Sequence, residues 1–309
     1  MKHLERALDG QNQWWKYLVI SVLAFVGANI IGAIPLVITI AVKTIQSTEP
    51  IIMNPNNPAD LSVYGISQNF GLILIIIPFV VGLLVMLPLF KALHKRKVVE
   101  VLNGRNSLRW KRCFVGFGIW FVLMTVYLIA SYYIDSESFV YQFDIKTFIP
   151  LLLISLLLIP FQTTFEEVLC RGYWAQGIAA ATRNRWLVVL IPGIAFALLH
   201  SFNPEIKEFG FWAVMPQYMI FGVLFGLIAT LDDGIELSMG VHAANNIFLS
   251  LFVTSKSSAL QTPAVFSQTN IDPMRETILL SAFGIALVII LAIIYKWNFG
   301  VLNRKVEKE

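Results

Sequence analysis

The sequence predicts an all-α fold, a polytopic integral membrane bundle of about eight transmembrane helices. Three observations predict it: 57% of the 309 residues are hydrophobic, only 14% are charged, and the mean hydropathy is +0.71. Soluble domains are about 45–50% apolar and about 25% charged. The composition therefore excludes a disordered chain and a nucleic-acid-binding module, and it disfavours a soluble enzyme. We expect a lipid bilayer, and no nucleic acid, around this chain.

The predicted spans are apolar runs long enough to cross a hydrocarbon core, which takes roughly 20 residues. The runs are continuous rather than alternating, which excludes a transmembrane β-barrel. Proline interrupts several of them, and membrane helices tolerate proline because neighbouring helices satisfy the freed backbone groups. The eight expected spans are residues 17–42, 70–90, 113–134, 147–165, 186–202, 212–231, 237–253 and 277–297.

Basic residues predict the orientation of the bundle, because cytoplasmic loops of membrane proteins are enriched in Lys and Arg. With the N-terminus inside, 18 of the 23 Lys and Arg residues fall in cytoplasmic segments. We therefore predict that both termini are cytoplasmic, in a cell membrane. The densest basic segment, 91–112, is interpreted as an orientation signal attracted to anionic lipid, with binding of nucleic acid or a partner as the alternative. Cys113 and Cys170 fall on the same side and are expected to be reduced thiols.

One outside loop, residues 44–69, is long and rich in proline and asparagine. Its composition is typical of a solvated connector, and a short lid over the membrane is the alternative. No cleavable signal peptide and no internal repeat are expected, so residues 1–309 should form a single membrane domain.

Ionisable side chains inside spans cost at least about 2.5–3.5 kcal/mol at mid-bilayer, so each one needs an explanation. Glu166, Glu167 and Arg171 form the first such cluster. On a helix Glu167 and Arg171 share a face and can pair. Glu166 is rotated away from that face and can point into a cavity, where a buried carboxylate can act as a general base. The alternative is a helix end at the membrane interface with solvated carboxylates.

Two further polar elements lie in apolar runs. Phe196 and His200 are one helical turn apart, and His200 could instead be a polar cap at the end of its helix. His242 and Asn246 are four residues apart and share a face, and small residues such as Gly240 allow another helix to come close. The alternative for this pair is a set of hydrogen bonds that hold two helices together.

Together these side chains supply the parts of a hydrolytic site. Glu166 with His200 can activate water, and His242 with Asn246 can stabilise the oxyanion that forms on a cleaved carbonyl. The sequence has no His-Glu-x-x-His zinc motif, no Gly-x-Ser-x-Gly elbow and no pair of Asp inside spans. Serine, aspartyl and site-2-type zinc mechanisms therefore lack their residues.

The ordered trio Glu-Glu-x-x-x-Arg, Phe-x-x-x-His and His-x-x-x-Asn resembles the three motifs of the CPBP family of intramembrane proteases. This family is related to CAAX prenyl protease 2 and to the bacteriocin-immunity (Abi) proteins. The resemblance covers residues 147–253 and implies that they form the catalytic core. Residues 1–146 would then be an N-terminal extension of three spans, and residues 254–309 a last span with a cytoplasmic tail.

The resemblance also implies a role for each motif residue. It implies Glu166 and His200 as water activators, His242 and Asn246 as oxyanion stabilisers, and Glu167 and Arg171 as their supports. A metal remains open, because Glu166, His200 and His242 would make a two-histidine, one-carboxylate zinc set with Glu167 left as base. A route without metal is also compatible with the family.

The expected function is that of an intramembrane endopeptidase, a metalloprotease if zinc is bound, acting on a peptide or a membrane protein. The compact loops and the lack of an organelle signal favour a bacterial plasma membrane and a substrate without a prenyl group. The alternative is a non-proteolytic membrane protein, such as an immunity factor, scaffold or transporter, that uses the same residues as a proton or ion relay. A transporter of the common kinds should show repeated halves.

One geometric difficulty follows from straight spans. They place Glu166 at the inner end of the fourth span and His200 near the outer end of the fifth. Fourteen residues of helix rise about 21 Å, so these two side chains would be too far apart to share one water. We therefore expect residues 166–185 to dip into the membrane as an elbow; the alternative is a fifth helix that starts deep in the membrane.

Overall fold

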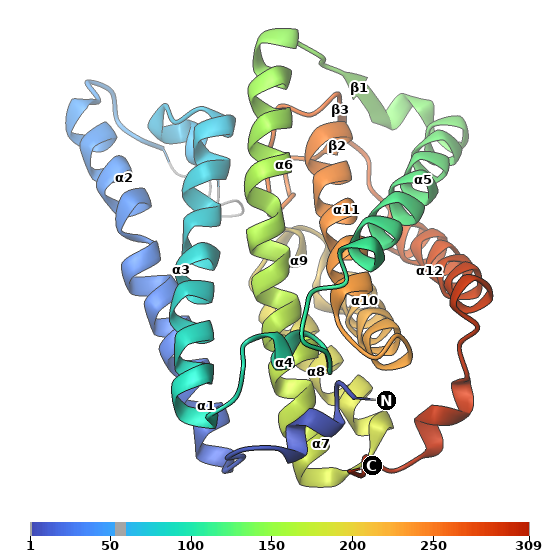
Figure 1. Cartoon of the computed structure of the whole chain (residues 1–309). Helices are drawn as coiled ribbons and strands as arrows, with labels where there is room; N and C mark the ends of the chain where they lie inside the picture. Colours follow the sequence, from blue (N-terminus) through green and yellow to red (C-terminus); the bar gives the residue numbers. More distant parts are fainter. Residues whose placement is uncertain (1, 53–59, 309) are drawn as a thin grey trace.

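The computed structural model describes residues 2–52 and 60–308, and it confirms a helical membrane bundle (Figure 1). Part of the connector predicted at 44–69 lies outside the described residues. The long helices are α1 (Trp14–Val26), α2 (Ile34–Gln46), α3 (Gln68–His94), α5 (Trp110–Ile134), α6 (Ile145–Glu167), α7 (Ala175–Thr182), α8 (Arg185–Leu199), α10 (Phe211–Leu231), α11 (Glu236–Phe252) and α12 (Pro273–Tyr295). The short elements are α4 (Val99–Leu102), α9 (Pro204–Phe209), β1 (Phe139–Tyr141), β2 (Val253–Thr254) and β3 (Phe266–Gln268).

Every predicted span falls on a helix, but not every such helix is a full span. Six helices of the described chain are long and apolar enough to cross a membrane. The other two, α8 and α11, have 15 and 17 residues. Most side chains of α11 are buried among other helices, so this helix contacts protein rather than lipid. Its polar residues can therefore face neighbouring helices instead of hydrocarbon.

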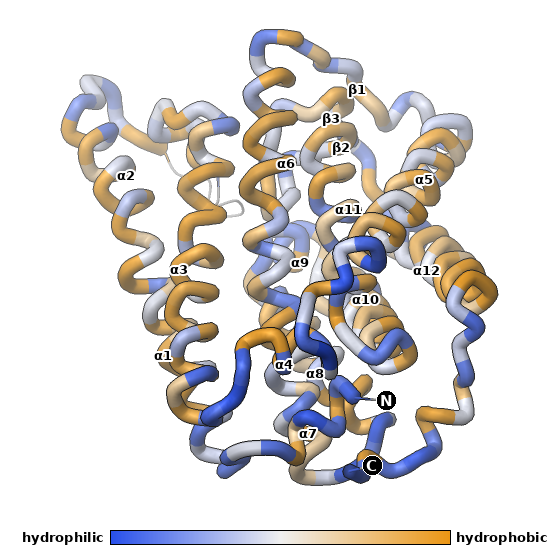
Figure 2. Tube along the Cα trace, in the orientation of Figure 1, coloured by the Kyte–Doolittle hydropathy of each residue, from blue (hydrophilic) through white to orange (hydrophobic). Residues whose placement is uncertain are grey.

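Both described ends of the chain lie at the same end of the bundle (Figure 1). Lys308 pairs with Asp9 at 2.9 Å, and the backbone N–H of Val306 donates to the carbonyl of Arg183. Hydrophilic residues gather at this end of the tube, and apolar residues fill the helices above it (Figure 2). At the opposite end β1 pairs antiparallel with β3. Both termini therefore lie on one side of the bundle, as eight spans require. That this side is cytoplasmic stays a prediction.

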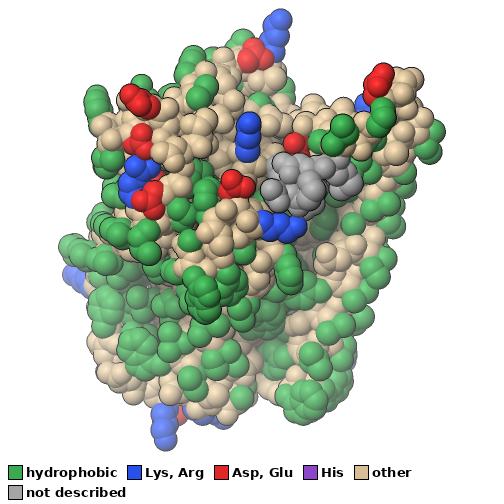
Figure 3. Space-filling view, turned by 180° about the vertical axis from the view of Figure 1, so that it is seen from behind, with side chains coloured by type: hydrophobic (Ala, Val, Ile, Leu, Met, Phe, Trp, Pro, Cys, Tyr) green, Lys and Arg blue, Asp and Glu red, His purple; other side chains and the backbone are tan. Residues whose placement is uncertain are grey.

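The back of the molecule shows the same separation of hydrophobic from charged side chains (Figure 3). Its lower part presents mainly hydrophobic side chains, with a few basic ones at the bottom edge. Acidic and basic side chains gather in the upper part of this face. A hydrophobic band bordered by charges on both sides is the surface that a bilayer requires.

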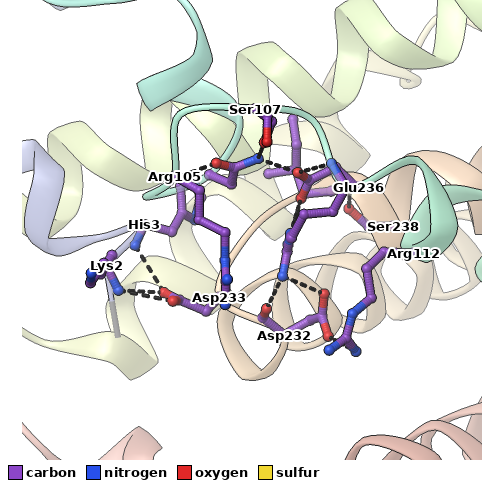
Figure 4. A network of polar contacts seen from close by, with 12 residues as sticks. Lys2, His3, Arg105, Ser107, Arg112, Asp232, Asp233, Glu236 and Ser238 are labelled. Atoms are coloured by element: carbon purple, nitrogen blue, oxygen red, sulfur yellow. Dashed lines mark hydrogen bonds and ion pairs between the residues drawn. The ribbon is translucent and has the colours of Figure 1, made fainter.

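A polar network joins the connections at the end that holds the termini (Figure 4). Arg109, which precedes α5, pairs with Asp232 at 3.1 Å and with Glu236 at 2.5 Å, in the turn between α10 and α11. The carboxylate of Asp233 accepts hydrogen bonds from the backbone N–H groups of Lys2 and His3. The basic segment at 91–112 is thus bound to the bundle itself through its last residues. This contact gives it a structural role in addition to the orientation signal predicted for it.

Glycines set two close helix contacts beside the polar residues. A Cβ on Gly240 of α11 would lie 1.9 Å from the carbonyl oxygen of Cys113 in α5. A Cβ on Gly222 of α10 would lie 2.2 Å from the carbonyl oxygen of Gly193 in α8. Small residues let helix backbones approach in this way. The close approach predicted at Gly240 is therefore present, and α11 lies directly against α5.

The elbow predicted for residues 166–185 is wrong. Helix α6 continues through a π-helical segment, η5 (Val168–Trp174), into α7, and forms one helix of 38 residues from Ile145 to Thr182. After a two-residue turn, α8 runs back for 15 residues to His200. Glu166 and His200 therefore lie at similar heights, each about 24 Å from the turn at 1.5 Å per residue. A longer helix, and not a re-entrant one, resolves the difficulty.

Candidate active site

Four of the predicted site residues line one cavity of about 820 Å³: Glu166, His200, His242 and Asn246. Their helices are far apart in sequence, and the cavity lies where α6, α8 and α11 come together with α10. The volume is within the range of about 300–1,000 Å³ that is typical of small-molecule sites. The sequence motifs thus converge on a single cavity, although their chemical roles stay predictions.

The two remaining predicted residues, Glu167 and Arg171, lie behind this cavity. Arg171 is buried and donates to Glu167 Oε1 at 2.9 Å and to the carbonyl oxygen of Gly222 at 3.0 Å. Its guanidinium also lies over the rings of Phe196 and Phe225. Arg171 therefore fixes the end of α6 against α8 and α10. Arg171 is inside the protein, although the prediction of 18 cytoplasmic Lys and Arg residues counts it among them.

His242 is oriented by the same glutamate. Its Nδ1 lies 3.0 Å from Glu167 Oε1, and a carboxylate accepts, so this nitrogen carries the proton. Its Nε2 then faces the cavity, 3.6 Å from Glu166 Oε2. That separation is longer than a direct hydrogen bond, and a contact of this length can be bridged by water. Glu167 thus sets which nitrogen of His242 is presented to a substrate.

Glu166 differs from its neighbour in its surroundings. Its side chain retains 12% of its exposure, whereas the side chain of Glu167 is fully buried. Its Oε1 accepts a hydrogen bond from the amide of Gln162, one turn earlier on α6, at 3.4 Å. Arg171 is paired with Glu167 and not with Glu166. The Glu166 carboxylate therefore lines the cavity without an arginine partner, as the sequence predicts.

His200 follows the last residue of α8 and is held by aromatic rings. It stacks on Tyr218 of α10 with ring centroids 4.4 Å apart and lies 4.6 Å from the ring of Phe196. Its Nδ1 lies 2.8 Å from the carbonyl oxygen of Phe196, so this nitrogen donates and Nε2 is left to accept. An imidazole in this tautomer can accept a hydrogen bond from water in the cavity.

The amide of Asn246 is oriented by a chain of hydrogen bonds. The indole N–H of Trp120 donates to Asn245 Oδ1 at 3.2 Å, and the Asn245 amide donates to Asn246 Oδ1 at 3.1 Å. The donor end of Asn246 is then directed away from Asn245, and an amide in this orientation can donate to an oxyanion. Trp120 comes from α5, so one residue outside the predicted core supports the site.

Zinc bound by Glu166, His200 and His242 would need three donor atoms around one point. Across the described residues, no group of three His, Cys, Asp or Glu side chains is placed to hold a metal ion. Each histidine donates from Nδ1 to a protein oxygen and leaves Nε2 free, as metal-bound histidines also do. In the described residues it is the placement of the three side chains, and not their tautomers, that does not fit the zinc set.

Three further residues support the site without being predicted as part of it: Gln162 and Tyr218 line the cavity, and Trp120 donates to Asn245. Gln162 could have been found, since it is a polar residue in an apolar run one turn before Glu166. Trp120 is fully buried, and a buried tryptophan usually needs a partner for its N–H, but the sequence does not show that it is buried. Tyr218 accepts from the amide of Asn203 and donates to Glu205, and only the packed loop brings these side chains together.

Two comparisons relate the chain to known proteins. Residues 146–248 match the family model for type II CAAX prenyl endopeptidases, Rce1-like. The chain is 31% identical over 302 residues to a protein of Bacillus subtilis (strain 168) named uncharacterized protein YyaK, and the match covers 96% of each chain. No solved structure matches the chain. The residues that match the family model contain all the predicted site residues, from Glu166 to Asn246.

Proposed function

We propose that this chain, which belongs to the Rce1-like family of type II CAAX prenyl endopeptidases, cleaves peptide bonds with water activated by Glu166 and His200. The family consists of intramembrane endopeptidases, and the six long apolar helices of the described chain make this a multi-pass membrane protein. The observation that carries the proposal is the convergence of Glu166, His200, His242 and Asn246 on one cavity.

The first step is the attack of water. The Glu166 carboxylate takes one proton from the water, and Nε2 of His200 accepts a hydrogen bond from the other. The water oxygen then bonds to the carbonyl carbon of the substrate, whose oxygen becomes an oxyanion. A water on Glu166 Oε2 lies beside His242 Nε2, because these two atoms are 3.6 Å apart, and the oxyanion that its attack creates therefore forms close to His242.

The second step is the stabilisation and collapse of the tetrahedral intermediate. The amide of Asn246 donates to the oxyanion, and His242 donates from Nε2 when it carries protons on both nitrogens. Glu167 and Arg171 keep His242 in place. The carbon–nitrogen bond then breaks and the leaving amine takes the proton from Glu166. The new carboxylic acid gives its remaining proton to the amine, so the products are a carboxylate and an ammonium group.

The proposed substrate is a peptide or membrane protein without a prenyl group, in a bacterial plasma membrane. The bacterial origin of the relative YyaK supports the location. The described lining of the cavity includes the carboxylates of Glu166, Glu205 and Glu276 but no Lys or Arg. A cavity without a cation offers little to a free C-terminal carboxylate, which favours an internal segment of the substrate.

A cleavage assay with a histidine variant tests the proposal. Purified protein in detergent is incubated with a mixture of fluorescence-quenched peptides, and the products are identified by mass spectrometry. We expect cleavage by the wild type and its loss in His200→Phe, because phenylalanine keeps a ring beside Tyr218 but has no atom that accepts a hydrogen bond from water. A wild type that cleaves no peptide and no membrane protein would favour the non-proteolytic alternative.

A further inference from the structure

The cavity is lined by connecting segments from one end of the bundle. Besides helical residues, its lining includes His200, Phe202 and Asn203, six of the residues from Thr254 to Leu260, and Gln268 and Ile271. These residues connect α8 to α9 and α11 to α12. In Figure 1 the connection that contains β2 and β3 lies at the end opposite to both termini. The cavity therefore extends from the catalytic side chains toward that end.

The end that holds the termini contributes none of its described connections to this lining. The turn between α10 and α11 is instead held by Arg109, through its ion pairs with Asp232 and Glu236 (Figure 4). The backbone N–H of Ile235 also donates to the carbonyl oxygen of Leu102 at 2.9 Å, which joins this turn to the end of α4. These contacts close the bundle below the site.

The interior between the site and the closed end is also filled. Glu167 and Arg171 are buried directly behind the cavity. Tyr173 is buried two residues after Arg171, and its hydroxyl donates to the carbonyl oxygen of Lys16. A substrate that came from the end of the termini would have to displace this packed layer. The path from the opposite end, by contrast, is a continuous cavity.

We propose that substrate enters from the end opposite to the termini. With the termini in the cytoplasm, as the basic residues predict, the substrate is a peptide segment exposed on the extracytoplasmic side of the membrane. This inference rests on the proposed endopeptidase function and specifies its substrate class. Its basis is that the described connections at one end line the cavity, whereas those at the other end are joined by ion pairs and contribute nothing to its lining.

Three matched Ser→Cys variants test the direction of entry, in a background in which Cys113 and Cys170 are replaced by alanine. Ser250→Cys lies in the cavity, one turn beyond Asn246, and Ser257→Cys lies at its loop-lined end. Ser107→Cys is the control, because this serine is exposed at the end of the termini. Each variant is expressed in bacteria, and right-side-out and inside-out membrane vesicles are treated with a charged, membrane-impermeant methanethiosulfonate.

We expect modification of Ser250→Cys and Ser257→Cys in right-side-out vesicles, and modification of Ser107→Cys only in inside-out vesicles. Modification of Ser250→Cys from the inside alone would overturn the proposed direction of entry. Modification of Ser107→Cys from the outside would overturn the orientation, and with it the extracytoplasmic substrate.

A second arm separates this inference from the proposed function. A quenched peptide that the detergent-solubilised protein cleaves is added to both kinds of vesicle. Cleavage by right-side-out vesicles and not by inside-out vesicles supports the inference, and the reverse overturns it. If no peptide is cleaved in detergent either, the proposed function fails and the substrate class fails with it. The labelling pattern then still decides from which end the cavity is reached.

Discussion

Glu166 and Glu167 are adjacent in sequence but should respond to the same substitution in opposite ways. In Glu167→Gln, the fully buried carboxylate becomes neutral while Arg171 keeps its charge. Removing one partner of a buried ion pair typically costs about 3–5 kcal/mol. At about 2–4 °C per kcal/mol, this loss corresponds to a fall in Tm of roughly 6–20 °C. Glu166 pairs with no arginine and is partly exposed in the cavity, so Glu166→Gln should leave the Tm nearly unchanged.

The assay is thermal unfolding of both purified variants in the same detergent, followed by tryptophan fluorescence, with the yield of folded protein recorded. Glu167→Gln combined with Arg171→Met is the control, because it removes both charges and should recover part of the lost stability. A Glu167→Gln variant with the Tm of the wild type would refute the structural role given to this pair. If Glu167→Gln were well folded but cleaved no peptide, Glu167 would be the residue that activates water, and Glu166 would have the supporting role.

Two further predictions concern the oxyanion and the polar network near the termini. Asn246→Ala removes one donor to the oxyanion and should slow cleavage by about 10²–10³-fold without abolishing it, as single-turnover rates would show; an unchanged rate would exclude this role. Burial raises the pKa of Asp232 from 3.8 to about 6, although Arg109 and Arg112 oppose the shift. Because the folded pKa is above the unfolded one, the stability that Asp232 contributes is present below pH 4 and is lost as the pH rises through 6. The shift is worth about 3 kcal/mol, so the Tm of the wild type should fall between about pH 4 and 6 relative to Asp232→Asn, and parallel profiles would contradict this.

The sequence alone was sufficient to predict where the membrane helices lie and that the motif residues come together. Apolar runs of about 20 residues locate membrane helices, because lipid offers no hydrogen bonds to backbone groups and a helix pairs all of them internally. The motif residues are rare polar groups in such runs, and a bundle places them together because they cost least when they contact one another. Glu166, His200, His242 and Asn246 accordingly line one cavity.

The continuation of α6 could not be read from the sequence in the same way. Glu166, Glu167 and Arg171 interrupt an apolar run, and hydropathy alone treats three charges in six residues as the end of a span. In the fold, Glu167 and Arg171 neutralise each other at 2.9 Å and are both buried. The helix can therefore continue through η5 to Thr182. Only the tertiary contact distinguishes an internal ion pair from a charged helix end.

The support of Asn246 by Trp120 also depends on tertiary packing. The two residues are 126 positions apart, in α5 and α11, and Asn245 links them. Tryptophans near the ends of spans usually mark the membrane interface, so a tryptophan in an apolar run gives no sign of a contact with the site. One N-terminal span, α5, therefore contributes to the orientation of the amide.

Cleavage by Glu166→Gln is the most direct test of the claim that this carboxylate activates water. The variant keeps the shape of the side chain and its place in the cavity but cannot take a proton. With a Tm close to that of the wild type, we predict that its cleavage of a peptide accepted by the wild type falls to background. Full activity in a well-folded Glu166→Gln would contradict the mechanism and favour a non-catalytic role for these buried residues.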